Sequence, residues 1–190
     1  VVDFNDSSLI QSVNALRWDG FGWWSTNVDG SGVARVAEYF GIDIASGATI
    51  GITGGGGAAR STARTWQKLG GKVLNLGGKR DLANNDWFKS DCDSEEICDV
   101  MINFDEDNIP EGVKITGLVM KASYHLIDGG FDDRVAAITD QVVDGRWLLS
   151  AQHLECWRQL WAPQVKDLLP SLDLLVSKLI TAETVLASYS

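Results

Sequence analysis

The sequence predicts an α/β protein of three layers, with a mostly parallel sheet, a short N-terminal hairpin and a helical C-terminus. Short apolar strands alternate with helical segments from about residue 47 to residue 119, and the chain turns helical after residue 130. A cluster of glycines also stands directly between the first of these strands and the helix that follows it. Alternating strands and helices form βαβ units with right-handed crossovers, so the strands are expected to run parallel.

The individual elements follow from turn residues and apolar periodicity. Residues 10–26 predict a hairpin around Asp19-Gly20, because Asp-Gly between β-prone runs is a strong hairpin signal. The polar turn at 27–32 opens a helix with one apolar face, and Gly41 suits its end. The other predicted elements are strands at 48–53, 72–76, 99–103 and 114–119 and helices at 58–69, 131–143, 147–161 and 166–187.

Composition excludes several classes of function. The 190 residues are 45% hydrophobic and 22% charged, as in an ordinary soluble domain, and the net charge of -10 argues against nucleic acid and anionic membranes as partners. No apolar stretch of about 18 residues predicts a transmembrane helix. The first residues lack the pattern of a signal peptide, and the chain starts without Met, as expected of a processed product or an excised fragment. We expect a cytoplasmic protein.

No metal site is expected from the sequence. Cys92, Cys98 and Cys156 lack metal-ligand spacing and are interpreted as ordinary thiols in a reducing compartment. The acidic segment at 86–107 is interpreted as a solvated connection, because it lacks the glycine-centred loop of fixed spacing that is typical of calcium sites.

The glycine-rich turn is the most informative local feature. Its residues follow a predicted strand and precede a predicted helix, which is the context in which a dinucleotide diphosphate binds. Glycines allow the backbone to approach the phosphates, and the amide groups at the helix start supply a favourable field. This prediction requires that the amides be open to the ligand; a tight turn without a ligand is the alternative. The predicted contacts are Gly54, Gly55, Gly56, Gly57 and Ala58.

The end of the second strand indicates which dinucleotide is favoured. An NAD site usually has a carboxylate there, but this chain has Gly77-Gly78-Lys79-Arg80. Lys79 and Arg80 are therefore predicted to hold the 2′-phosphate of NADP, with the fork of the Arg guanidinium as the better partner. The alternative is a pair of solvated loop charges, and Asp81 is a possible counter-ion for Arg80.

Four segments together resemble the C-terminal part of shikimate dehydrogenases. Residues 12–15 (Ser-Val-Asn-Ala) are similar to the family's Ala-Val-Asn-Thr, and residues 27–32 to its Asn-Thr-Asp-Gly-x-Gly. Residues 54–60 resemble its Gly-Ala-Gly-Gly-Ala-Ala-Arg turn, and residues 144–152 its Asp-Gly-x-x-Met-Leu-x-x-Gln segment. Order and spacing match from about residue 12 to residue 161, which is more specific than any one segment.

The resemblance implies a Rossmann-like NADP-binding domain at 27–163, a remnant of a substrate-binding domain at 1–26, and a C-terminal helical segment at 164–190 that packs on the domain or on a partner. It implies reversible, NADP-dependent reduction of 3-dehydroshikimate to shikimate in aromatic amino-acid biosynthesis. Asp29 matches the catalytic carboxylate, Asn14 and Gln152 match contacts to substrate hydroxyls, and Asn103 matches a cofactor contact. Asp29 as a simple helix N-cap is the alternative.

The chain also departs from the family pattern. The family's catalytic Lys lies in an N-terminal half that is not in this sequence, so that domain is expected as a partner in cis or in trans. Segments 77–80, 103–106 and 121–124 differ from the family motifs. A second hypothesis follows, namely a catalytically degenerate relative that serves as a binding or structural module. Its apolar C-terminal segment is expected to mediate assembly, for example as a homodimer.

Overall fold

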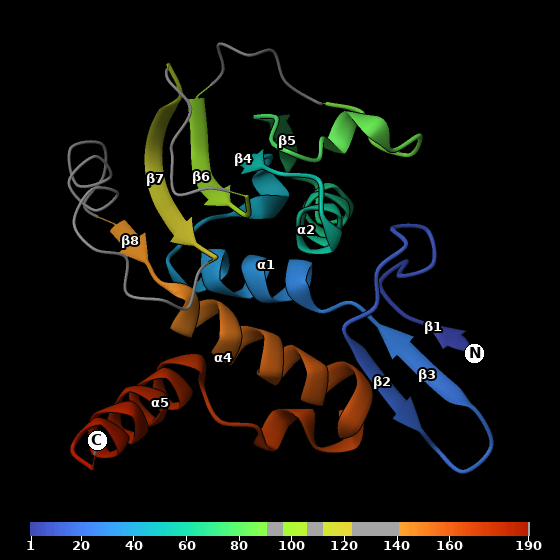
Figure 1. Cartoon of the computed structure of the whole chain (residues 1–190), viewed down its shortest axis with the longest axis vertical. Helices are drawn as coiled ribbons and strands as arrows, with labels where there is room; N and C mark the ends of the chain where they lie inside the picture. Colours follow the sequence, from blue (N-terminus) through green and yellow to red (C-terminus); the bar gives the residue numbers. More distant parts are fainter. Residues whose placement is uncertain (91–96, 106–111, 123–140, 190) are drawn as a thin grey trace.

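The computed structural model describes residues 1–90, 97–105, 112–122 and 141–189. Two sheets organise this part of the chain (Figure 1). The smaller sheet has the order β1-β3-β2, with β1 parallel and β2 antiparallel to the central β3. The larger sheet has the order β5-β4-β6-β7-β8, and all of its strand pairs are parallel. The strands are β1 (Val2–Asp3), β2 (Ala15–Trp18), β3 (Trp23–Thr26), β4 (Thr49–Thr53), β5 (Lys72–Asn75), β6 (Ile97–Asn103), β7 (Lys114–Lys121) and β8 (Gln141–Val143).

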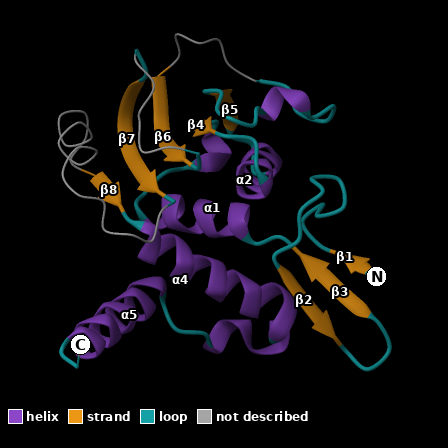
Figure 2. Ribbon diagram, viewed as in Figure 1, coloured by secondary structure: helices purple, strands orange, loops and turns teal. Residues whose placement is uncertain are grey.

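The described helices pack against the sheet and against one another (Figure 2). Helix α1 lies between α2 and α4, and α5 packs on α4. The main core fills the space between these helices and one face of the larger sheet, while Met101, Ile115 and Val119 form a smaller cluster on the other face. The helical elements are α1 (Asp29–Tyr39), α2 (Gly57–Lys68), α4 (Gly145–Cys156), η3 (Trp157–Trp161, a π-turn), α5 (Leu172–Ala187) and the 3-10 turns η1 (Ile44–Ser46), η2 (Leu82–Asn84) and η4 (Pro163–Leu168).

The predicted fold class is confirmed. Strand β4, the glycine-rich turn and α2 follow one another as predicted, and β4 pairs in parallel with both β5 and β6. All five residues of β4 are buried, with Ile50 and Ile52 in the main core and Thr49, Gly51 and Thr53 on the other face, as expected of a central strand that is covered on both faces. Trp66 of α2 is also fully buried, and its indole N–H donates to the carbonyl oxygen of Ala48.

Several element boundaries differ from the prediction. The predicted helix at 131–143 is wrong for its last three residues, because Gln141–Val143 forms β8 and pairs with β7. Its other residues lie outside the described part of the chain. The β-branched pair at 142–143 favours a strand, and the Asp144 side chain then caps α4 by accepting a hydrogen bond from the Arg146 amide.

The hairpin and the C-terminal helices are also shorter than predicted. Residues 10–14 lie outside the hairpin, whose strands pair Ala15 with Thr26 and Trp18 with Trp23. The segment 147–161 ends in a π-turn, and the segment 166–187 is interrupted after η4, just before Pro170. Proline disfavours a helical conformation in the residue before it, so α5 begins only at Leu172.

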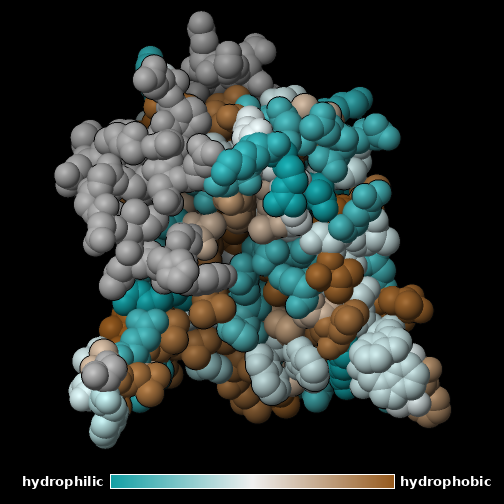
Figure 3. All heavy atoms as spheres, viewed as in Figure 1, coloured by the Kyte–Doolittle hydropathy of each residue, from teal (hydrophilic) through white to brown (hydrophobic). Residues whose placement is uncertain are grey.

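Apolar side chains remain exposed on the lower side of the molecule, where α4, η4 and α5 lie (Figure 3). The buried face of α5 uses Leu172 and Val176 against the core. Other positions of α5 and the preceding turn expose large apolar residues, namely Leu168, Leu174, Ile180, Val185 and Leu186.

Candidate functional site

The three residues predicted to face a substrate come together in one hydrogen-bonded cluster. Asn14 lies just before β2, Asp29 is the first residue of α1, and Gln152 lies in the middle of α4. The Asn14 side-chain amide donates to Asp29 Oδ1 at 2.8 Å, and the Gln152 amide donates to the same oxygen at 2.9 Å. We call these three residues the carboxylate–amide cluster. Gln152 is 123 residues from Asp29 in the sequence, so the tertiary fold brings it to the cluster.

Neighbouring polar groups fix the orientation of the cluster. The Asn14 side-chain oxygen accepts from the Val28 amide at 3.0 Å, so its NH₂ group is directed to Asp29. Asn27 is buried; its side-chain oxygen accepts from the Asp29 amide, and its NH₂ group donates to Ser12 Oγ. Sequence reasoning gave Asn27 no role of its own, although it stands two residues before Asp29 in the matched motif.

The environment of Asp29 differs from that of a helix cap. The residue before α1 is Val28, no side chain caps this helix, and Asp29 lies within its first turn. Burial raises the pKa of the Asp29 carboxyl above its ordinary value, while hydrogen bonds from Asn14 and Asn27 act in the opposite direction. A half-buried carboxylate of raised pKa, held by two amides, is suited to accept a proton from a ligand hydroxyl.

Two glycines allow the cluster to form. A Cβ at Gly30 would clash with the Ser61 carbonyl oxygen of α2, and a Cβ at Gly32 would lie 2.8 Å from Cγ of Gln152. Helix α1 therefore approaches both of its neighbours closely only because these positions lack side chains. The same contacts bring Gln152 to the start of α1, where Asp29 lies.

The glycine-rich turn lies beside this cluster. Ser12 Oγ, which accepts from Asn27, lies against Gly57, where any Cβ would clash with it. Gly56 precedes α2, and no side chain caps this helix by a hydrogen bond. The predicted order of strand, turn and helix therefore holds. The turn itself is not open, however, because Gly54, Gly55 and Gly56 are all buried.

The loop after β5 covers the turn. The Gly54 amide donates to the Gly77 carbonyl oxygen at 2.6 Å. A Cβ at Gly55 would lie 2.6 Å from the Asp81 carbonyl carbon and 2.8 Å from that of Arg80. A Cβ at Gly56 would lie 2.8 Å from the Arg80 guanidinium. The space that a dinucleotide diphosphate needs is thus filled by this chain's own backbone, and the residues present do not fit that group in this conformation.

The other predicted cofactor contacts also serve this covering loop. Asn103 is buried; its side-chain oxygen accepts from Thr53 Oγ1 at 2.6 Å and from the Asp105 amide at 3.1 Å. Asp105 Oδ2 in turn accepts from the Lys79 amide at 2.8 Å. The cofactor roles of Lys79, Arg80 and Asn103 remain predictions, and the segment 121–124 continues beyond the described residues after position 122.

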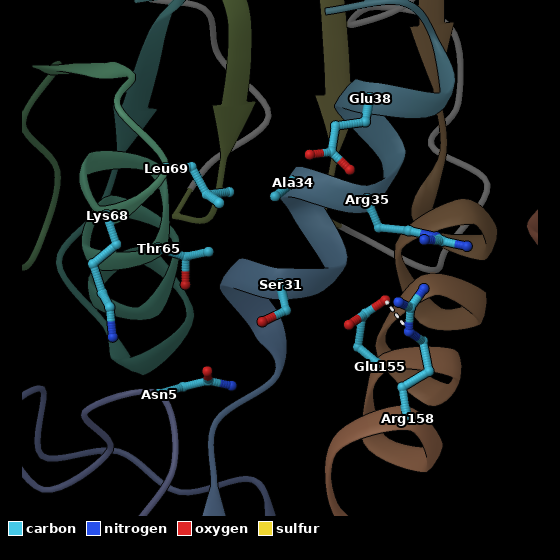
Figure 4. A pocket seen from close by; sticks show the side chains of 10 residues that line it. All are labelled: Asn5, Ser31, Ala34, Arg35, Glu38, Thr65, Lys68, Leu69, Glu155 and Arg158. Atoms are coloured by element: carbon cyan, nitrogen blue, oxygen red, sulfur yellow. Dashed lines mark ion pairs between the residues drawn. The ribbon is translucent and has the colours of Figure 1, made fainter. Parts of the chain in front are cut away.

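A separate polar groove of about 300 Å³ lies between α1, α2 and α4 (Figure 4). It contains none of the predicted site residues. Its charges have both signs, and Arg158 forms an ion pair with Glu155 at 3.7 Å. The groove has three basic and two acidic side chains, so no single sign of charge dominates it. Its lining residues are Asn5, Ser31, Ala34, Arg35, Glu38, Thr65, Lys68, Leu69, Glu155 and Arg158.

Within the described ranges, His, Cys, Asp and Glu form no group of three that could hold a metal ion. Within the same ranges, no helix has the length and apolar character needed to cross a membrane. Cys98 is buried and Cys156 is half-buried, neither in a disulfide among the described residues, whereas Cys92 lies outside the described residues.

Comparison with known proteins supports the resemblance that the motifs indicate. The chain is 41% identical over 80 residues to shikimate dehydrogenase (NADP(+)) of Methylibium petroleiphilum. The match covers 42% of this chain and 24% of that enzyme, so the chain matches only a quarter of the length of this relative. No protein-family model matches the sequence.

Solved structures agree with the fold over most of the chain. Shikimate 5-dehydrogenase of Thermus thermophilus in complex with shikimate has a TM-score of 0.71 at 19% identity, covering 95% of this chain and 71% of that one. The same enzyme in complex with NADP(H) and shikimate gives 0.70 at 18% identity, covering 92% and 70%. Shikimate dehydrogenase of Aquifex aeolicus gives 0.64 at 19% identity, covering 85% of this chain and 65% of that one. The resemblance to shikimate dehydrogenases is therefore confirmed, and the structural matches establish the Rossmann-like α/β fold.

Proposed function

We propose that this chain is a shikimate-dehydrogenase-like protein that recognises a polyhydroxylated ring carboxylate, such as shikimate, through the carboxylate–amide cluster. The observation that carries this proposal is the convergence of Asn14 and Gln152 on one oxygen of Asp29. A relative that is 41% identical to this chain over 80 residues is a shikimate dehydrogenase, and a solved structure of similar fold is a complex with shikimate. The assignment of these roles to this chain is our proposal.

The chemistry of the cluster suits a hydroxyl ligand. Each side-chain amide has two N–H donors and one carbonyl acceptor, so Asn14 and Gln152 can each hold Asp29 with one N–H and contact a ligand with the other. Asp29 can accept the hydrogen of a ring hydroxyl. When a secondary alcohol is oxidised to a ketone, the hydroxyl proton must leave, and a carboxylate of raised pKa is a suitable acceptor for it.

A second candidate is the complete NADP-dependent interconversion of shikimate and 3-dehydroshikimate. The sequence similarity to an NADP(+) enzyme and the placement of the glycine-rich turn between β4 and α2 support it. It requires a hydride acceptor, and the covering of the turn by the loop at 77–81 opposes binding of that cofactor. It also requires a Lys beside Asp29, whereas the partners of Asp29 in the described part of the chain are amides. The covered turn thus favours recognition without turnover.

The proposal is tested by titrating shikimate into the isotope-labelled chain and following the side-chain amide signals of Asn14 and Gln152 by NMR. We expect both signals to shift and saturate. Asp29→Asn should weaken binding about tenfold or more, because a charge-assisted hydrogen bond is lost in a partly buried site. The matched control is Glu38→Gln, which removes the same charge further along α1, where Glu38 lines the separate groove.

Two results would contradict the proposal: amide signals that do not respond to shikimate, or equal affinity in the wild type and Asp29→Asn. If Glu38→Gln rather than Asp29→Asn abolished binding, the groove between the helices would be the binding site. The second candidate is tested separately by following NADPH formation with shikimate and NADP. We expect no turnover above background from this chain alone.

A further inference from the structure

We propose that Asp105 holds the loop at 77–81 over the glycine-rich turn, a contact that we call the clasp. The Asp105 carboxylate then occupies the position that a phosphate of a dinucleotide would take, and prevents the dinucleotide from binding. The inference concerns the cofactor side of the molecule. It does not depend on the proposed substrate side, because it uses none of the residues of the carboxylate–amide cluster.

Sheet topology brings the two parts of this clasp together. Strand β4 lies between β5 and β6, so the turn after β4 is flanked by the loop after β5 and by the residues after β6. The carboxyl ends of parallel strands at such a position are the usual place for a ligand. Here the first segment contributes Gly77 and Gly78, and the second contributes Asp105. All three meet above Gly54, because the Gly54 amide lies 2.6 Å from the Gly77 oxygen and 2.7 Å from where a Cβ of Gly78 would be.

The Asp105 carboxylate is bound as an anion would be. Its Oδ2 accepts from two successive backbone amides, those of Lys79 at 2.8 Å and Arg80 at 3.5 Å. Successive backbone N–H groups that converge on one oxygen form an anion-binding nest. Its Oδ1 lies 2.9 Å from where a Cβ of Gly54 would be. A phosphate that entered here would find these amides already bound to the Asp105 carboxylate, and the negative charge of the carboxylate would repel it.

The obstruction is backbone rather than a movable side chain. Gly55 faces the carbonyl groups of Arg80 and Asp81, which no change of rotamer can displace. The loop is also fixed at its far end, where Asp81 accepts hydrogen bonds from the Asn75 side chain at 2.6 Å and from the Ala83 amide at 2.8 Å. The loop must therefore move as a unit before the turn can open, and the hydrogen bonds of Asp105 oppose that motion.

If the clasp is released, the loop at 77–81 should be able to bind a phosphate instead of covering the turn. The Arg80 guanidinium already lies beside Gly56, where a diphosphate would approach the start of α2 most closely. Once Asp105 no longer holds the loop, Arg80 and the freed amides of residues 79 and 80 become available to a phosphate. Removal of the Asp105 charge should therefore increase affinity for NADPH.

The experiment titrates NADPH, by its fluorescence, into the wild-type 190-residue chain and into Asp105→Ala, Asp105→Ser and Asp86→Asn. Asp86 is exposed in the segment after η2, so its variant controls for net charge. We expect the wild type and Asp86→Asn to bind too weakly to saturate, and Asp105→Ala to bind at least about tenfold more tightly, since a like charge and a competing anion are removed. Asp105→Ser should also gain affinity.

Three results would overturn the inference: saturation of the wild type at the affinity of the Asp105 variants, no gain of affinity in either Asp105 variant, or an equal gain of affinity in Asp86→Asn.

Amide hydrogen exchange on the wild type gives a test without any substitution. We expect the Lys79 amide to exchange slowly because Asp105 accepts its hydrogen bond, and fast exchange there would contradict the clasp. Shikimate binding is measured separately by the NMR signals of Gln152, so failure of one proposal leaves the other testable.

Discussion

Asp29 and Asp19 are two carboxylates placed in opposite environments. Burial is the largest influence on Asp29 and raises its pKa. Asp19 is fully exposed in the hairpin turn, where the backbone amide of Phe21, the indole N–H of Trp24 and the amide of Gly22 donate to it and lower its pKa. The charged form of Asp19 is thus favoured by folding, and the charged form of Asp29 is disfavoured.

The two Asp→Asn variants should therefore respond to pH with opposite signs. When the folded-state pKa lies above the unfolded-state pKa, stability falls as the pH rises from the unfolded to the folded pKa. When the folded-state pKa lies below the unfolded-state pKa, stability falls as the pH decreases from the unfolded to the folded pKa. Relative to the wild type, Asp29→Asn should gain stability as the pH increases from about 3 to about 7, and Asp19→Asn should lose it. Urea unfolding at several pH values measures both. Parallel responses of the two variants would show that Asp29 is not held in a desolvated site.

At the scale of residues, the sequence predicted the grouping of Asn14, Asp29 and Gln152 better than the covering of the glycine-rich turn. Asn14, Asp29 and Gln152 stand in motifs whose spacing is fixed by the fold, and the structure brings them together. Asp105 could not be recognised in the same way. Its role depends on how far the loop after β5 folds back over β4, and neither periodicity nor motif spacing encodes that path.

Helix α1 is the element that builds the candidate site. It begins with Asp29 and passes between α2 and α4, and the Gly30 amide donates to Ser61 Oγ at 3.0 Å. Its packing faces contain Gly30 against α2 and Gly32 against α4. The two glycines of the matched motif are therefore explained by close helix packing as well as by any ligand.

Alanine at these two glycines should have different effects. Gly30→Ala places a methyl group against the backbone of α2 and should destabilise the protein by about 1–3 kcal/mol. Gly32→Ala meets Cγ of Gln152 at 2.8 Å and its backbone nitrogen at 3.1 Å, a looser contact than that of Gly30, so it should displace Gln152 and weaken shikimate binding with a smaller loss of stability than Gly30→Ala. Gly22→Ala, where nothing lies within 4 Å, is the control and should change stability by less than about 0.5 kcal/mol. Thermal unfolding and the NMR titration separate these outcomes; a large stability loss in Gly22→Ala would invalidate the comparison.

At the scale of elements, the parallel sheet was predictable because β4, β5, β6 and β7 are short apolar runs bounded by glycine or polar residues. Strand β8 was missed: its two valines favour a strand, but the run has only three residues, adjoins a helix cap and pairs with β7. Its place at the edge of the sheet is set by tertiary contact rather than by local pattern.

The whole molecule joins a small N-terminal sheet to the α/β body through a few polar contacts. The Arg17 guanidinium donates to the Leu160 carbonyl oxygen at 2.7 Å, and the Asn5 amide donates to Gln159 Oε1 at 2.6 Å. Figure 1 shows this sheet beyond the start of α1, away from the larger sheet. The predicted division at residues 26 and 163 and the predicted homodimer remain predictions. The exposed apolar residues of α5 are where such a dimer would be expected.

Arg60 is the side chain that ties the N-terminal segment to the glycine-rich turn. Its guanidinium donates to the carbonyl oxygens of Ile10 at 2.7 Å, Gln11 at 3.2 Å and Gly55 at 3.0 Å. Ile10 is itself fully buried, so this contact anchors the segment that leads to Asn14. The fork of donors is specific to arginine, and lysine has no equivalent geometry.

Arg60→Ala should therefore loosen residues 1–26 more than the larger sheet. Loss of hydrogen bonds to three carbonyl groups should cost about 1–3 kcal/mol, and hydrogen exchange should accelerate in β2 and β3 while β4 stays protected. Shikimate binding should weaken as well, because Asn14 reaches Asp29 only while this segment is anchored. Arg35→Ala, on α1 at the separate groove, is the control and should leave exchange in β2 and β3 unchanged. Uniform acceleration in both sheets would mean that the molecule unfolds as one unit and that Arg60 does not act as a local anchor.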